Sequence, residues 1–165
     1  MRIFVTLGTQ KFQFDRLLKE IDKLVEKGKI EKENLLVQCV YSEYIPSNFE
    51  MFAMKTQNEI EEIMKNVDLV ITHSGTGSII TSLKLGKKII IVPRLKKYKE
   101  HVDNHQVELA DVFKETVNAI VVEDMDKLEM AIEESKTHKF NKWESNNNEI
   151  KYSIDKDIQE VIKFR

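Results

Sequence analysis

The residues best suited to chemistry lie in one short segment near the middle of the 165-residue chain. They combine two glycines with three hydroxyl side chains: Ser74, Gly75, Thr76, Gly77 and Ser78. Residues 68–72 have the β-branched character of a buried strand, His73 begins the turn that follows, and the apolar residues after the turn recur at helical spacing up to Gly86. Main-chain N–H groups at the start of a helix lack partners within the helix, and glycines let an anion approach them closely. The segment therefore predicts a phosphate site, although the same glycines would also suit a turn that only packs a helix against a sheet.

Two further polar segments follow apolar runs in the same way. Gly8 and Thr9 follow residues 2–7, and residues 93–106 follow the run at 89–92. Strands that alternate with helices at this spacing predict parallel βαβ units in one doubly wound sheet. Ligands of such sheets bind beyond the carboxyl ends of the strands, so we expect all three segments to meet at one edge.

The elements that must position these segments are predicted from apolar runs and apolar stripes. Further strands are expected at 35–40, 49–54 and 117–122, and helices at 14–25, 57–66, 105–113 and 124–135. Residues 94–103 show no periodicity and are expected to form a polar, lysine-rich loop. We expect the domain to span residues 1–136. A polar linker at 137–148 and a helix at 149–165 follow, and that helix would close over its own domain or dock on a partner.

Composition excludes several classes of function. The chain has 26 basic and 28 acidic residues, and its net charge of −2 does not indicate nucleic-acid binding. The single cysteine, Cys39, cannot form an internal disulfide and is expected to be a core thiol rather than a nucleophile. The first ten residues turn polar too early for a signal peptide, and no apolar run approaches the ~20 residues of a membrane span.

Other short motifs favour their ordinary structural interpretations. His101 and His105 are spaced like metal ligands on a helix, but no third ligand accompanies them, so we expect no metal. The sequence carries neither the nucleophile elbow of hydrolases around Ser74 nor a dinucleotide-binding glycine pattern after the first strand, so no cofactor is expected. Lysines at 96, 97 and 99 predict a solvated loop or, alternatively, contact with an anionic lipid.

Four blocks of sequence together resemble the glycosyltransferase family 28 C-terminal domain. They are residues 4–9, 71–79, 86–94 and 103–110, in the order and spacing of that family. The chain is more narrowly similar to the free-standing, donor-binding subunits of two-part UDP-sugar transferases. Such subunits serve eukaryotic lipid-linked oligosaccharide synthesis and bacterial capsule and exopolysaccharide synthesis. The resemblance implies a Rossmann-like fold equivalent to the C-terminal half of a GT-B glycosyltransferase.

The resemblance also implies a role for each block in binding a UDP-sugar. Gly8-Thr9 and residues 74–78 are expected at the diphosphate, and residues 54–57 near uracil. In His105-Gln106, the glutamine is expected to bind sugar hydroxyls. Many relatives carry a ribose-binding glutamate where this chain has Thr81, which cannot bridge two hydroxyls as a carboxylate does.

Transfer of a sugar needs a stabilised leaving diphosphate and a general base for the acceptor. Main-chain N–H groups, with a nearby cation such as Arg94, would stabilise the diphosphate without a metal, but no carboxylate is marked as the base. We therefore expect a partner: a membrane-associated, acceptor-binding subunit that resembles the N-terminal half of a GT-B enzyme. The expected function is transfer of a sugar from UDP-sugar to a lipid-linked acceptor by the pair, at the cytoplasmic face of the membrane. The alternative is a non-catalytic module that stabilises or enhances a separate transferase.

Overall fold

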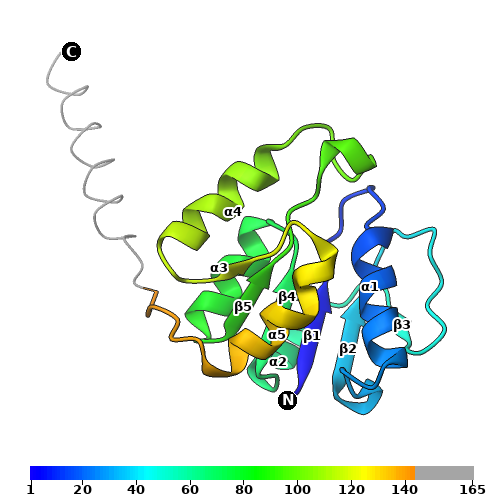
Figure 1. The fold of residues 1–165 in the computed structure, drawn as a ribbon, viewed down its shortest axis with the longest axis horizontal. Helices are drawn as coiled ribbons and strands as arrows, with labels where there is room; N and C mark the ends of the chain where they lie inside the picture. The colour runs from blue at the N-terminus through cyan, green and yellow to red at the C-terminus, as the bar shows by residue number, and fades with distance from the viewer. Residues whose placement is uncertain (144–165) are drawn as a thin grey trace, which may run out of the picture.

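The computed structural model describes residues 1–143, which form a parallel sheet covered by helices (Figure 1). The strands are β1 (Ile3–Thr6), β2 (Leu35–Gln38), β3 (Met51–Phe52), β4 (Leu69–Thr72), β5 (Lys88–Ile91) and β6 (Ile120–Val121). The α-helices are α1 (Asp15–Glu26), α2 (Gln57–Lys65), α3 (Thr76–Lys84), α4 (His105–Glu115) and α5 (Leu128–Thr137). Short 3-10 helices lie at η1 (Lys32–Asn34), η2 (Lys96–Tyr98) and η3 (Met125–Lys127). The predicted α/β, doubly wound parallel sheet is confirmed.

The order of the strands reverses its direction between β1 and β4. The sheet runs β3-β2-β1-β4-β5-β6 with every pair parallel, so the chain winds outward first to one side and then to the other. Thr6 lies opposite Thr72, and Thr72 lies opposite Ile91, so β1, β4 and β5 end level with one another. Doubly wound sheets bind ligands at this point of reversal.

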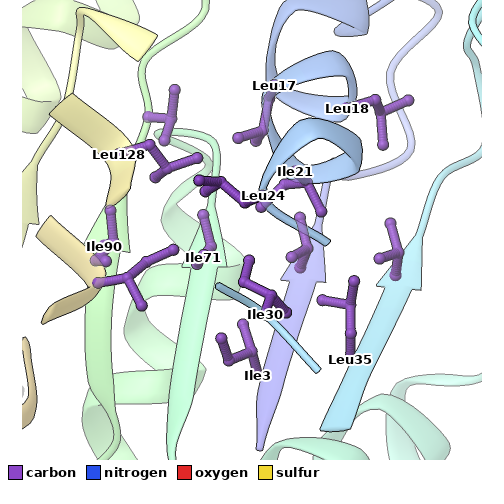
Figure 2. Packing of buried hydrophobic residues seen from close by; sticks show 14 of the residues in the cluster. Ile3, Leu17, Leu18, Ile21, Leu24, Ile30, Leu35, Ile71, Ile90 and Leu128 are labelled. Carbon is purple, nitrogen blue, oxygen red and sulfur yellow. The ribbon is translucent and has the colours of Figure 1, made fainter. Parts of the chain in front are cut away.

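Alternate residues of the strands form a core on each face of the sheet. On one face, α1 and α5 pack against the odd-numbered residues of β1 together with β2 and β4, and Figure 2 shows the leucines and Ile21 of α1 directed at these strands. On the other face, α3 and α4 pack against β5, and α2 packs against Phe4 and Val70. Because both faces are covered, the central strands are apolar throughout, which is why their sequences show no alternation.

Two edge strands are shorter than the sequence predicts. The run at 49–54 forms only Met51–Phe52, and the run at 117–122 forms only Ile120–Val121. Val117 instead ends α4 in the left-handed region, with φ 56, and its N–H donates to the Lys114 carbonyl. A β-branched residue seldom adopts that conformation, so sequence alone assigns Val117 to a strand.

The predicted linker at 137–148 is wrong in its first part. Thr137 is the last residue of α5, and Asn141 is tied to the end of α4 by its N–H to the Val117 carbonyl and its Nδ2 to the Thr116 carbonyl. Trp143 packs against the apolar cluster beneath α3 and α4. Residues 138–143 therefore belong to the domain.

The rest of the predicted linker and the predicted terminal helix at 149–165 lie outside the described residues. Within residues 1–143, every helix is too short or too polar to cross a membrane.

Candidate functional site

The predicted site residues converge on the level ends of β1, β4 and β5. Gly8 follows β1, Ser74 follows β4 and Arg94 follows β5, and these strands are neighbours in the sheet. In Figure 1 the connections after these strands lie at one edge of the sheet, the edge at which α3 and α4 begin. The convergence predicted from the sequence is therefore present.

His73 joins two of these segments, although the sequence prediction did not include it. A Cβ atom on Gly8 would lie 2.5 Å from Cε1 of the imidazole, and one on Gly75 would lie 2.3 Å from Nε2. Both distances are far below a normal carbon contact, so a side chain at either position would have to displace the buried imidazole. Gly8 also has φ +71, where a side chain is strained. A histidine between a buried strand and a glycine loop was the signal in the sequence.

The imidazole of His73 is buried and uncharged at neutral pH. Burial lowers its pKa from 6.5 to about 4, and the positive charge of Arg94 acts in the same direction. A hydrogen bond with the main chain of Thr6 has the opposite, smaller effect. The ring is thus a neutral spacer between the two glycine segments that carries at most one N–H donor.

The first turn of α3 is open to solvent and uncapped. Gly75 is the N-cap and has no side chain to accept a hydrogen bond, and Thr76 and Gly77 are exposed. No hydrogen bond within residues 1–143 uses the N–H groups of Thr76, Gly77 or Ser78. The hydroxyl of Ser74 is buried and has no partner in the described chain. Buried polar groups are nearly always satisfied, so the Ser74 hydroxyl favours a ligand that accepts hydrogen bonds, and the solvent-exposed N–H groups beside it could donate to the same ligand.

Arg94 does not face the ligand site, which corrects its predicted role. Its side chain is 1% exposed. The guanidinium donates to the carbonyls of Leu7 at 2.7 Å, Phe12 at 3.0 Å and Gln13 at 2.8 Å. Burial lowers the pKa of Arg94 to about 10, opposed by Glu100, so the group stays charged at neutral pH. Its charge therefore interacts with main-chain carbonyls inside the fold and does not face a diphosphate.

The structure separates the two members of the His105-Gln106 pair. Gln106 is buried, and its Oε1 accepts the N–H of Arg94 at 3.1 Å, which leaves its Nε2 as the free end of the amide. His105 is exposed at the first position of α4, where its Nδ1 lies 3.3 Å from Oε2 of Glu108. Gln106 is therefore fixed against the end of β5, and its Nε2 remains available as a hydrogen-bond donor to a ligand.

For the remaining predicted residues, the structure gives positions but no contacts with the rest of the site. Thr9 is exposed beyond Gly8, and Thr81 is half-buried on α3, past its first turn. In the segment expected near uracil, Thr56 and Glu59 form a capping box that satisfies the start of α2. None of the predicted residues lines a cleft of about 1090 Å³ that runs along α1 toward the connections after β2, β5 and β6.

Metal ligands do not gather at this edge. Across residues 1–143, no three histidine, cysteine or acidic side chains lie close enough together to hold a metal ion. The Nδ1 of His101 lies 2.9 Å from the Asp103 carboxylate, and the Asp103 carboxylate also accepts the N–H of His105. That hydrogen bond is the main reason why the pKa of Asp103 is lowered.

The strand order and the glycine segments at its point of reversal define a Rossmann-like α/β domain of the kind that forms the C-terminal half of GT-B glycosyltransferases. A solution structure of ALG13 shares this fold with a TM-score of 0.58, over 89% of this chain and 90% of that one, at 20% identity. Streptomyces sp. glycosyltransferase SsfS6, solved with thymidine diphosphate, gives a TM-score of 0.53 over 82% of this chain and 32% of that one, at 20% identity. At such identities the likeness concerns the fold alone.

Residues 2–162 match the glycosyltransferase family 28 C-terminal domain, and the chain belongs to this family. The UDP-N-acetylglucosamine transferase subunit ALG13 of Saccharomyces cerevisiae is 30% identical over 122 residues, which cover 70% of this chain and 57% of that relative. The chain spans smaller shares of other curated relatives, down to 10%.

Proposed function

We propose that this chain is the donor-binding subunit of a two-component glycosyltransferase that moves a sugar from a UDP-sugar to a lipid-linked acceptor. The observation that carries the proposal is the open start of α3 beside the Gly8 segment, where the N–H groups and the Ser74 hydroxyl have no partner among residues 1–143. Family membership and the names of the relatives, which are transferase subunits, support the same reading.

A diphosphate suits this edge because several weak interactions act on it together. The helix dipole contributes only ~0.3–1 kcal/mol at an exposed helix start, so affinity must come from several N–H bonds at once. These donors are fixed before the ligand arrives, because His73 sets the spacing of the Gly8 and Gly75 segments. The same donors would stabilise the charge that develops on the leaving UDP.

Gln106 would contact the sugar. Its Oε1 is committed to Arg94, so its Nε2 would donate to a sugar hydroxyl oxygen next to the diphosphate. The threonine at position 81 would give ribose at most one hydrogen bond where relatives use a glutamate. We therefore expect recognition of the donor to depend more on the diphosphate and the sugar than on the ribose.

The acceptor and the general base would come from a second, membrane-associated chain that resembles the N-terminal half of a GT-B enzyme. The start of α3 is an open surface, and a facing domain would exclude water from the donor, as transfer rather than hydrolysis requires. The pair would work at the cytoplasmic face of the membrane, in glycan, capsule or exopolysaccharide synthesis.

The test combines UDP binding with transfer by the reconstituted pair. Calorimetry should detect UDP binding to the wild type, and Gly75→Val should abolish both binding and transfer, because its side chain collides with His73. Thermal unfolding must show that the variant is folded at the temperature of the assay. A wild type without UDP affinity, or full transfer by Gly75→Val, would refute the donor role and favour an accessory module.

A further inference from the structure

Arg94 forms a buried bridge from β5 to the segment that follows β1. Among the large side chains it is one of the most completely enclosed, with 1% exposure. Its Nη2 donates to the Leu7 carbonyl, the residue directly before Gly8, and its Nη1 donates to the carbonyls of Phe12 and Gln13. One guanidinium thus fixes both ends of the segment that contains Gly8 and Thr9.

The main chain of the same residue holds the second predicted contact. The N–H of Arg94 donates to Oε1 of Gln106, which holds the amide in place and leaves its Nε2 as the free donor. The diphosphate segment and the sugar-binding amide are therefore connected through a single residue.

The neighbours of Arg94 leave its hydrogen bonds to the carbonyls undisturbed. The buried carboxylate of Glu100 is already engaged by Arg16 at 3.0 Å and by the N–H of Leu95 at 2.9 Å. The guanidinium of Arg94 lies over the ring of Phe14, 4.7 Å from its centroid. A planar, forked donor fits this position, whereas a lysine has one nitrogen and cannot reach three carbonyls in the same geometry.

We propose that Arg94 is a positioning residue of the donor site. It sets the main chain of Gly8-Thr9 against the amide of Gln106, so that a UDP-sugar meets its diphosphate and sugar contacts together. This inference rests on the proposed function, and Arg94 itself does not touch the ligand. Loss of the forked guanidinium of Arg94 should therefore displace the Gly8 segment, while every group that contacts the ligand keeps its chemical identity.

Arg94→Lys tests the inference, with Arg16→Lys as the matched control. Both substitutions remove a forked donor near Glu100, but Arg16 is only partly buried and contacts Glu100 and the carbonyls of Pro93 and Glu123, not the segment after β1. Calorimetry with UDP and a UDP-sugar should show a loss of affinity of roughly tenfold or more for Arg94→Lys alone, because displaced donors lose their fit. Amide NMR signals of Gly8 and Thr9 should move only in Arg94→Lys.

The outcomes separate this inference from the proposed function. If the wild type does not bind UDP, the proposed function fails and the inference fails with it. If the wild type binds UDP but Arg94→Lys matches Arg16→Lys in affinity, Arg94 is only structural and the inference alone fails.

Should Arg94→Lys not fold, the wild type still provides a test. UDP titration should shift the Arg94 Nε–H signal and the Gly8 amide signal with one common saturation curve. A Gly8 signal that moves while the Arg94 signal stays fixed would overturn the coupling.

Discussion

Two helical segments begin at the same edge of the sheet, and their first turns are built in opposite ways. The turn η3, which leads into α5, starts after β6 with Asp124, whose carboxylate accepts the N–H of Asp126 at 3.2 Å. The helix α3 starts after β4 with Gly75, which caps nothing. Within the described part of the chain, a carboxylate caps the start of η3 and no side chain caps the start of α3.

This difference teaches how the fold separates a structural turn from a binding turn. A carboxylate at an N-cap accepts hydrogen bonds from main-chain donors and complements the helix dipole. A bound phosphate would have the same two effects. At α3 the donors are instead held in place by packing, with His73 between Gly8 and Gly75. Substitutions at α3 should therefore change ligand binding, and substitutions at η3 should change only stability.

After Gly75→Val, the largest effect is expected for Gly8→Ala. The new Cβ would lie 2.5 Å from the His73 ring at φ +71, so the segment must move, and UDP affinity should fall on the order of a thousandfold. Gly28→Ala is the matched control, because it has φ +68 but no atom within 4 Å of the added carbon. Calorimetry should show strong loss for Gly8→Ala and none for Gly28→Ala; equal affinities would break the comparison.

The buried histidine predicts a pH dependence of stability. Because the pKa of His73 is lowered to about 4 in the folded state, the unfolded chain binds more protons between pH 6.5 and 4. The free energy of unfolding should thus be unaffected by this group above pH 6.5 and should fall, by about 3 kcal/mol in all, as the pH drops toward 4.

His73→Phe isolates that contribution from the titration of the carboxylates. The phenyl ring preserves an aromatic spacer beside the glycines but does not titrate in this range. Urea unfolding at several pH values should give a shallower pH dependence for His73→Phe than for the wild type. Parallel curves would mean that the imidazole is not buried as described.

A smaller, selective effect is expected for Gln106→Ala. The variant loses the Nε2 donor, so affinity for a UDP-sugar should fall by about tenfold while affinity for UDP changes little. The N–H of Arg94 also loses its partner, and thermal stability should decrease as well. Calorimetry with both ligands makes the distinction, and an equal loss for UDP and UDP-sugar would contradict contact with the sugar.

The sequence predicted the frame of this site because the frame depends on local patterns. The runs before Gly8 and Ser74 are apolar and β-branched, and the glycines mark the turns after them, so strand order and the binding edge follow from general rules. The family resemblance then supplied the roles of the segments.

The directions of individual side chains could not be predicted in the same way. Arg94 sits in a polar, lysine-rich segment and looked like a surface cation, yet carbonyls more than eighty residues earlier in the chain enclose it. His73 looked like part of a loop, but its ring lies against both the neighbouring Gly75 and Gly8, which is 65 residues earlier in the chain. Such contacts depend on tertiary packing, which no local pattern encodes.

The smallest effect is expected at the capped turn, where Asp124→Ala removes the carboxylate of η3. Loss of an N-cap costs about 1 kcal/mol, so the midpoint of urea unfolding should fall slightly. UDP affinity should not change, because the N–H groups of this turn serve the chain and not a ligand. Asp124→Asn is the matched control, since asparagine also caps helices and should retain most of the stability. A loss of UDP affinity in Asp124→Ala, at a temperature where it is fully folded, would mean that both helix starts contribute to binding, and the division between a self-capped and a ligand-capped turn would be wrong.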